Sequence, residues 1–163
     1  METQEVTMAV QGKLLTTSDD LTEAFAIRKE VFLYELGMTE QLVFDEMDRE
    51  AIHVIIYEDV KDENQSKDKI AVATGRLHFD GYHCELSQIA VLKDYRRKRY
   101  GDFAVRMLLN RAFQAGMEVI TYSPNTLFQF FESIGFHKDN SEQKNGNYRM
   151  IINASDIHTL CLK

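Results

Sequence analysis

The alternation of hydrophobic and polar positions along the chain predicts six strands. Apolar runs rich in β-branched residues are typical of buried strands, and shorter, more polar runs are typical of sheet edges. The predicted strands are residues 6–11 (an edge-type strand), 52–57, 70–79, 82–91, 118–123 and 147–153. The pair Asp80-Gly81 is a strong hairpin-turn signal between two of them. Asn145-Gly146 is a second turn signal, in a polar stretch to which no strand is assigned.

Three other stretches have apolar residues near helical spacing and are predicted as helices. They are residues 18–37, 102–116 and 125–136. Ser18 or Asp19 suits the N-cap of the first helix, and Gly37 can close it. The acid-rich segment 39–51 that follows is predicted as a loop or a short helix. The resulting order of strand, helix, strands, helix, strand, helix and strand is that of a mixed α/β sheet.

Composition places the chain among soluble globular proteins. Its 163 residues, 44% hydrophobic and 28% charged, suffice for a single domain, residues 1–163, with a real hydrophobic core. The net charge of −7 argues against a nucleic-acid partner, because such proteins usually carry a basic surplus. The sequence has neither a secretory signal pattern nor the ~20 apolar residues of a membrane span. Cys84 and Cys161 lack metal-ligand spacing, so we expect reduced cysteines in a cytoplasmic protein without a bound metal.

The stretch DYRRKRYG, Asp94 to Gly101, places four consecutive basic residues, Arg96 to Arg99, between a predicted strand and a predicted helix. Unpaired amides at a helix start and in a tight loop favour anions, so the layout is that of a phosphate cradle. The glycine-rich patterns of nucleotide-binding loops are absent, because only Gly101 is present. A nuclear address and a solvated basic turn are the other interpretations that the residues leave open.

Several motifs, in this order, resemble those of the GNAT N-acetyltransferase superfamily. The stretch LSQIAVLKDYRRKRYGDFAVRMLLNRAFQAG resembles the acetyl-CoA-binding motif, a strand followed by a pyrophosphate loop of the pattern Gln/Arg-x-x-Gly-x-Gly/Ala. Arg96 matches the first position of this pattern and Gly101 the last. FQFFESIGF resembles the second motif, and IRKEVFLYELG, DEMDREAIHVI and AVATGRL resemble the front half of one branch of the family. The resemblance spans Ala24 to Met150 and implies the GNAT acyl-CoA N-acyltransferase fold, an α/β fold with a central mixed, mostly antiparallel sheet flanked by helices.

The resemblance also implies an activity and a set of cofactor contacts. Family members transfer an acetyl group from acetyl-CoA, their cosubstrate, directly to an amine, usually without a covalent enzyme intermediate. Here Ile89, Ala90 and Val91 would lie beside the pantetheine arm like an added strand, and the thioester carbonyl would be polarised near Val91. The residues that would surround the pyrophosphate are Arg96, Arg97, Lys98, Arg99, Tyr100, Gly101 and Asp102. The amine acceptor is not identified by the sequence, and a homodimer, common in the superfamily, stays open.

Several positions depart from the family pattern. Arg97 and Arg99 stand where glycine is common, so the loop either keeps φ below 0° or is strained, and the extra cations could reach CoA phosphates. Phe131 stands where many members carry the tyrosine credited as general acid. Pro124 stands where an amide side chain often contacts the cofactor, which displaces that contact to Asn125. These departures motivate an alternative function, an acyl-CoA-binding regulatory protein of GNAT fold with weak or no transferase activity.

Amine acetylation needs a base that keeps the amine neutral and an acid that protonates the leaving thiolate. Glu85, on the strand that should border the substrate, is the most natural base, directly or through water; a solvent-facing strand residue is the competing interpretation. Tyr122 on the neighbouring strand is the candidate acid, against the simpler interpretation of a packed aromatic. His78 and His83 flank the hairpin turn and could also serve as a base, although such a turn is usually plain surface.

The acidic segment 45–48 and the residues around it have simpler structural interpretations. His53 enters a buried strand and is expected to be a hydrogen-bonded structural histidine rather than a metal ligand. Arg28 and Arg76 lie on otherwise apolar elements and are expected to pair with these acids. The same acids could attract a cationic amine or could simply form a solvated face.

Overall fold

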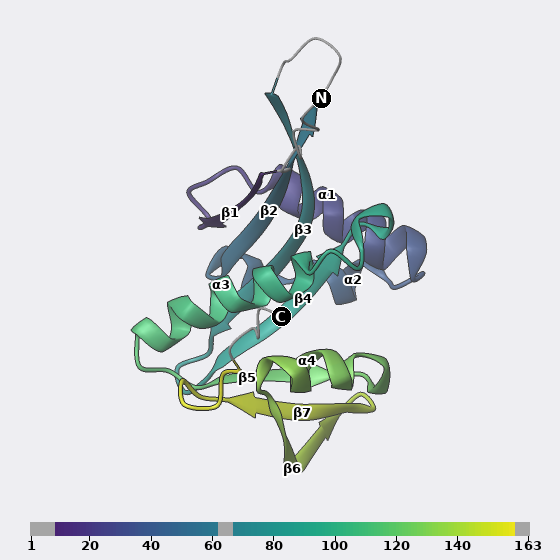
Figure 1. The fold of residues 1–163 in the computed structure, drawn as a ribbon. Coiled ribbons are helices and arrows are strands. Elements are labelled where there is room, and N and C mark those ends of the chain that lie inside the picture. Colours follow the sequence, from purple (N-terminus) through teal and green to yellow (C-terminus); the bar gives the residue numbers. More distant parts are fainter. Residues whose placement is uncertain (1–8, 62–66, 159–163) are drawn as a thin grey trace.

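The computed structural model describes residues 9–61 and 67–158, which form a seven-stranded sheet with helices on both faces (Figure 1). The strands are β1 (Val10–Leu15), β2 (Ile52–Lys61), β3 (Lys67–Phe79), β4 (Cys84–Val91), β5 (Val119–Ser123), β6 (His137–Lys144) and β7 (Asn147–Ile152). The α-helices are α1 (Thr22–Arg28), α2 (Glu40–Val43), α3 (Tyr100–Gln114) and α4 (Phe128–Ile134). A π-helix, η1 (Lys29–Glu35), and the 3-10 helices η2 (Glu46–Arg49), η3 (Lys93–Tyr95) and η4 (Asn125–Leu127) complete the described elements.

The sheet is mixed and mostly antiparallel, as the resemblance implied. Its strand order is β1-β2-β3-β4-β5-β7-β6, and every neighbouring pair is antiparallel except β4 and β5, which run parallel. A parallel pair needs a crossover between its strands, and α3 supplies it. The predicted mixed α/β fold is therefore confirmed.

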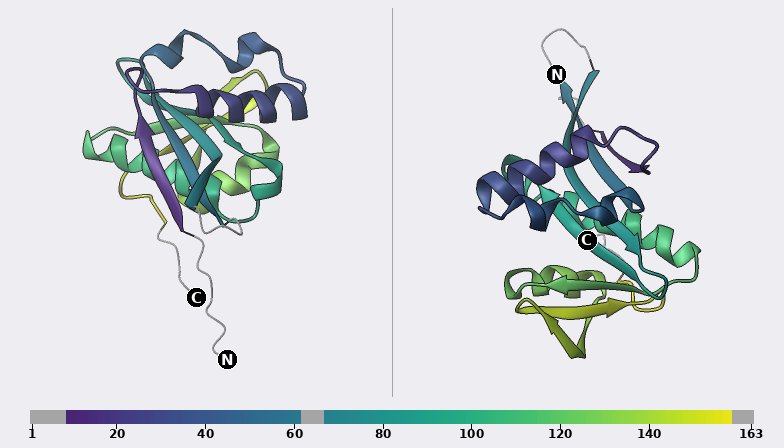
Figure 2. Two further views of the ribbon diagram at one scale, coloured as in Figure 1. Left: turned by 90° about the horizontal axis from the view of Figure 1, so that it is seen from above. Right: turned by 180° about the vertical axis from the view of Figure 1, so that it is seen from behind.

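Helices α3 and α4 lie on one face of the sheet, and α1 and η1 lie on the other (Figure 2). On the first face, Leu108 of α3 and Ile134 of α4 belong to the main hydrophobic core. On the second face, Ile27 and Val31 pack against Ala90 of β4. The central strands are thus covered twice, which explains the continuous apolar run in β2, where Val54, Ile55 and Ile56 are all buried.

The first strand differs from the prediction of residues 6–11. Residues 1–8 lie outside the described part, and β1 runs from Val10 to Leu15, paired with β2. This register buries Leu15 and brings Gly12 under α3, where an added Cβ would lie 2.0 Å from the Met107 sulfur. The close approach of strand and helix therefore selects the register, and the apolar run at 6–11 did not reveal it.

The first helix also differs from the single helix predicted at 18–37. The α-helical part spans only Thr22–Arg28, and the chain continues as the wider π-helix η1 before Gly37 ends it with φ of 67°. A sequence period near 3.6 does not separate the two helix types, because the apolar positions shift by only one residue per turn. The glycine stop was predicted correctly.

The polar strand β6 was missed. Its sequence, HKDNSEQK, has no apolar alternation, yet it pairs with β7 at the sheet edge, with a register shift between Lys138 and Gln143. The turn signal Asn145-Gly146 was correct, since these residues adopt φ of 53° and 80° and join the two strands. The other predicted elements exist with ends shifted by a few residues, and the helix predicted at 125–136 divides into η4 and α4.

A buried charge network holds the segment 45–48 against the sheet. Arg28 Nη1 lies 2.7 Å from Asp48 Oδ1, and Arg76 Nη1 lies 3.0 Å from the same oxygen and 2.6 Å from Asp45 Oδ1. His53 Nε2 lies 3.2 Å from the Asp48 carbonyl oxygen, and burial lowers the pKa of this histidine. The expected pairing of the two arginines with these acids, and the structural role of His53, are confirmed.

No helix in residues 9–61 and 67–158 combines the length and the apolar character needed to cross a membrane.

Replacing Asp48 by asparagine should destabilise the fold by about 3 kcal/mol, because Arg28 would lose its carboxylate partner while buried. Burial alone would raise the pKa of Asp48, but Arg28 and Arg76 outweigh it and lower the pKa. The stabilisation by Asp48 is therefore present above about pH 4, the unfolded-state pKa, and is lost as the pH falls through the lower folded-state pKa. Urea unfolding from pH 7 to pH 2 should show a weaker acid dependence in D48N than in wild type. The same exchange at the exposed Asp68 is the control; equal acid slopes in all three proteins would contradict the prediction.

Candidate active site

The parallel strands β4 and β5 separate after three residue pairs. Their pairing covers Cys84–Leu86 and Val119–Thr121, whereas β4 continues to Val91 along β3 (Figure 1). Gln88, with φ of 57°, marks the point of divergence, and the β3–β4 register shifts beside it. Among the described strands, none pairs with residues 88–91 on the β5 side. This stretch of edge, which includes Ile89, Ala90 and Val91, is open to an added extended chain.

The loop between β4 and α3 has an unusual backbone. Arg97 and Arg99 adopt φ of 65° and 63°, so the second of the two alternatives, a strained loop, is the one observed. A left-handed conformation costs a non-glycine residue roughly 1–2 kcal/mol. The amides of Arg97, Lys98 and Arg99 have no acceptor in the described part of the chain, and the first helical bond runs from the Phe103 amide to Arg99. Successive unpaired amides at a helix start form a binding site for an anion.

The side chains of this loop fall into two groups. Arg96 donates to Glu35 of η1 at 2.5 and 2.6 Å, and hydrogen bonding to this carboxylate raises the arginine pKa. Its Nε also donates to the Val91 carbonyl at 3.0 Å. Asp102 accepts from Arg106 at 2.7 Å. The partners of Lys98 and Tyr100 lie on β2 and are described below.

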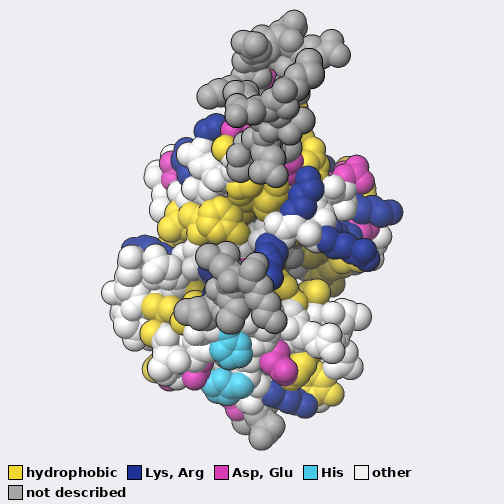
Figure 3. All heavy atoms as spheres, in the orientation of Figure 1, with side chains coloured by type: hydrophobic (Ala, Val, Ile, Leu, Met, Phe, Trp, Pro, Cys, Tyr) yellow, Lys and Arg dark blue, Asp and Glu magenta, His cyan; other side chains and the backbone are white. Residues whose placement is uncertain are grey.

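Arg97 and Arg99 form the second group, because both are exposed and neither has an ion-pair partner among the described residues. Lysine and arginine side chains gather over this loop in Figure 3. Arg99 and Lys98 also line a pocket of about 280 Å³ beside Phe103 and Arg106. The basic stretch therefore divides into residues that hold the loop and two cations that face solvent.

Gly101 lies in the first turn of α3, in the buried space between Val91 and Phe130. An added Cβ would lie 3.4 Å from Val91 Cγ2 and 3.6 Å from Phe130 Cζ, which is ordinary van der Waals contact. The packing of the protein itself therefore does not demand glycine here.

Glu85 and Tyr122 lie on the same face of the sheet, opposite α3 and α4. Glu85 pairs with Ile120 in the parallel register, and Tyr122 follows Ile120 by two residues, so their side chains point to one side. Both are half-buried. Glu85 has no hydrogen-bond or ion-pair partner within residues 9–61 and 67–158, and Lys144 of β6 lies 5.2 Å from the Tyr122 ring centroid. This face therefore carries an unpaired carboxylate and a phenol on the two strands that diverge.

Asn125 and Phe131 differ sharply in exposure. Asn125 is exposed at the start of η4, next to the end of β5. Phe131 is 4% exposed and makes edge-to-face contacts with Phe130 and Phe136, with centroid separations of 5.0 and 5.4 Å. Phe131 thus contributes to the core.

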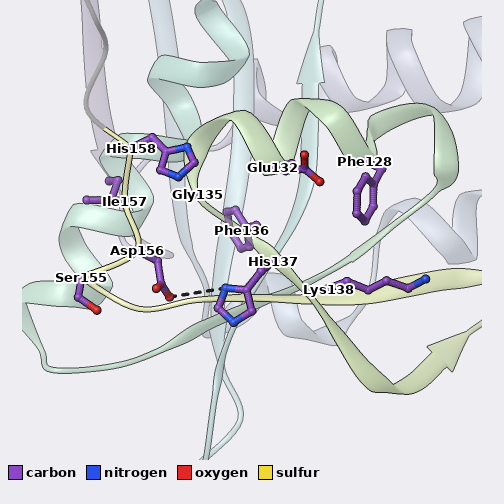
Figure 4. Close-up of a pocket in the computed structure, with 10 residues that line it drawn as sticks. All are labelled: Phe128, Glu132, Gly135, Phe136, His137, Lys138, Ser155, Asp156, Ile157 and His158. Atoms are coloured by element: carbon purple, nitrogen blue, oxygen red, sulfur yellow. Dashed lines mark ion pairs between the residues drawn. The ribbon is translucent and has the colours of Figure 1, made fainter.

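The histidines at the hairpin end and a second pocket lie apart from the loop before α3. His83 Nδ1 lies 3.9 Å from Asp80 in the exposed turn, and the described residues contain no group of side chains that could hold a metal. A pocket of about 610 Å³ lies beside the end of α4, where His137 Nδ1 is 3.7 Å from Asp156 (Figure 4). It contains none of the residues predicted for the active site.

The sequence did not reveal two acidic residues that hold the loop. Glu35 lies in η1 and Glu58 lies in β2, far along the chain from the basic stretch. A carboxylate directly after the apolar run of β2 was the available signal for Glu58, because a charged residue in a buried strand needs a partner.

Two parallel strands diverge in the sheet, and a loop with unpaired amides leads from the first of them into the helix that connects them; this arrangement matches the fold of acyl-CoA N-acyltransferases. Residues 19–139 match the Acetyltransferase (GNAT) family, and the chain belongs to this family. The protein is 31% identical over 134 residues to the uncharacterized protein YyaT of Bacillus subtilis. The aligned region covers 80% of this chain and 84% of YyaT.

Solved structures agree on the fold. An acyl-CoA N-acyltransferase from Pseudomonas aeruginosa superposes with a TM-score of 0.71 at 16% identity, covering 88% of this chain and 99% of that one. The PaiA N-acetyltransferase from Thermoplasma acidophilum, solved in complex with coenzyme A, gives a TM-score of 0.63 at 12% identity, covering 90% and 99%.

Replacing Arg97 by glycine should raise the free energy of unfolding by up to about 1 kcal/mol. Glycine removes the left-handed cost, which exceeds its own entropic cost in the unfolded chain. Urea denaturation measures the change. Arg97→Ala is the matched control, because alanine keeps the Cβ and gains nothing. A glycine variant no more stable than the alanine variant would show that the backbone is relaxed.

Proposed function

We propose that the protein is an acetyl-CoA-dependent N-acetyltransferase that transfers the acetyl group directly to a primary amine of a small molecule or a peptide. The observation that carries the proposal is the loop before α3, with its unpaired amides and two solvent-facing arginines next to the open edge of β4. A soluble location in the cytoplasm and a single domain over residues 1–163 belong to the same proposal, with a homodimer as the first assembly to test.

The residues present fit coenzyme A. The amides of 97–99 and the guanidinium groups of Arg97 and Arg99 suit a pyrophosphate, and the edge at 88–91 suits the two amides of a pantetheine arm. Asp102 and Asn125 lie at the starts of α3 and η4, near the two sides of this opening. The structural neighbour from Thermoplasma acidophilum was solved with coenzyme A, which supports the assignment. When bound, acetyl-CoA supplies an acetyl group activated as a thioester.

Glu85 is the proposed base and Tyr122 the proposed acid. The amine nitrogen forms a bond to the thioester carbonyl carbon while its proton passes to the Glu85 carboxylate, directly or through water. As the carbon–sulfur bond breaks, the Tyr122 hydroxyl gives its proton to the sulfur. Because Glu85 has no cationic partner in the described chain, it can also attract an amine in its protonated form.

The competing function is an acyl-CoA-binding protein without efficient transfer. It draws on the absence of a hydroxyl at Phe131, which is packed into the core. Calorimetric titration with acetyl-CoA and a panel of amines separate the two. Binding without turnover of any amine supports the competing function, and no binding at millimolar acetyl-CoA rejects both.

Replacing Glu85 by glutamine should lower kcat/KM for the best amine by a factor of about 10²–10⁴, the usual contribution of general base catalysis. The affinity for acetyl-CoA should not change, since Glu85 lies away from the loop. Steady-state kinetics measure both. Glu132→Gln, at an exposed position on α4, is the control. Full activity of E85Q would show that this carboxylate is only a strand residue facing solvent.

Replacing both Arg97 and Arg99 by glycine should weaken CoA binding and reduce its dependence on salt concentration. The two side chains supply charge that salt screens, whereas the backbone amides remain. Calorimetry between 50 mM and 500 mM NaCl gives the slope. Affinity and slope equal to those of wild type would mean that these arginines face solvent even in the complex.

A further inference from the structure

Strand β2 carries a buried carboxylate whose two partners are Lys98, in the loop before α3, and Tyr100, the first residue of α3. Glu58 is 3% exposed. Lys98 Nζ lies 3.3 Å from its Oε1, and the Tyr100 hydroxyl donates to its Oε2 at 2.5 Å. The Glu58 carboxylate therefore connects strand β2 to the end of the loop and to the first residue of α3.

The two partners flank a strained residue. Lys98 and Tyr100 stand on either side of Arg99, and Lys98 itself lies between the two left-handed residues. Left-handed arginines persist only where the surrounding structure holds them. Anchoring residues 98 and 100 to one carboxylate fixes the backbone between them, since neither can move away without breaking a charge-assisted bond.

Burial, together with the hydrogen bond to Glu58, raises the pKa of Tyr100 to about 12. The hydroxyl therefore stays protonated and remains a donor across the physiological pH range.

We propose that Glu58 is a positioning residue for coenzyme A: through Lys98 and Tyr100 it holds Arg97 and Arg99 in the left-handed conformation that presents the loop amides to the phosphates. The proposal rests on the proposed function, because it assumes that this loop binds the CoA phosphates. Glu58 itself does not touch the ligand. A merely structural role would stabilise the whole fold without a specific effect on the loop.

We call the contacts of Glu58 with Lys98 and Tyr100 the clamp. Two variants weaken this clamp to different degrees. Tyr100→Phe removes one hydrogen bond, and Glu58→Gln removes the charge that both partners share. Calorimetry with CoA should give a Kd about tenfold higher in Glu58→Gln, and a smaller increase in Tyr100→Phe, as expected for lost charge-assisted bonds. With saturating acetyl-CoA, kcat of Glu58→Gln should stay at the wild-type value while KM for acetyl-CoA rises, because Glu58 touches neither the ligand nor the reacting atoms.

The same strand offers a matched control. The hydroxyl of Tyr57, the neighbour of Glu58, donates to Glu23 of α1 at 3.1 Å on the other face of the sheet. Tyr57→Phe removes an exposed tyrosine–glutamate hydrogen bond outside the loop, and the Kd for CoA should not change.

A pair of substitutions at Arg99 separates loop geometry from general stability. Asparagine tolerates the left-handed region and glutamine does not, yet both remove the charge and supply an amide. Adding Tyr100→Phe should raise the Kd severalfold in the Arg99→Gln background and less than about twofold in Arg99→Asn, where the clamp is no longer needed.

Hydrogen exchange in the ligand-free protein provides a readout that does not depend on CoA. The Phe103 amide, which donates to the Arg99 carbonyl in the first hydrogen-bonded turn of α3, should exchange faster in Tyr100→Phe than in wild type, with the rest of α3 unchanged. If wild type fails to bind CoA, the proposed function falls and exchange alone decides whether Glu58 orders the loop. If wild type binds CoA but the clamp variants bind equally well, or lose affinity equally in both Arg99 backgrounds, the positioning role is overturned.

Discussion

The limited contact between β4 and β5 is the constraint on which the rest of the molecule depends. Three residue pairs hold the two halves of the sheet together, and beyond Leu86 and Thr121 the strands diverge. The Thr121 hydroxyl donates to the Leu86 carbonyl at 2.9 Å at that limit. A longer parallel pairing would close the edge of β4 and leave no place for an extended ligand arm. The site is therefore created where a regular sheet ends early.

Charges buried beside this opening are compensated in pairs and networks. Arg28, Arg76 and Asp48 fix the segment before β2 on one face, and Glu58 fixes the loop before α3 from the sheet. Each network connects elements far apart along the chain. An isolated buried charge is costly. Replacing one charged residue of a network would therefore destabilise the fold mainly by leaving its buried partners without a counter-charge. The segment before β2 and the loop before α3 are therefore held rigidly. Glu85, Arg97 and Arg99, by contrast, have no ion-pair partner among the described residues and can interact with a ligand.

The hydrophobic pattern was sufficient for the order of elements and for the buried central strands, because burial on both faces leaves a continuous apolar run such as that of β2. It was insufficient for β6, whose edge position requires no apolar residues, and for the register of β1, which depends on contact with Met107. In the candidate site, the order and spacing of the motifs predict the basic loop as the phosphate site. The sequence left the conformation of Arg97 and Arg99 open between two alternatives and did not point to their proposed anchor Glu58, because contacts with distant residues leave no mark on the loop sequence itself.

The polar strand β6 has a consequence for how such a protein can change over generations. It lies at the edge of the sheet, none of its described side chains belongs to the hydrophobic core, and it places Lys144 against Tyr122, the proposed acid. Substitutions at its exposed positions should therefore cost little folding stability, whereas substitutions around Glu58 would loosen the loop before α3, the proposed cofactor site. Under the proposed function, the surface beside Tyr122 can therefore change while the loop before α3 is retained, which would give one scaffold access to many amines.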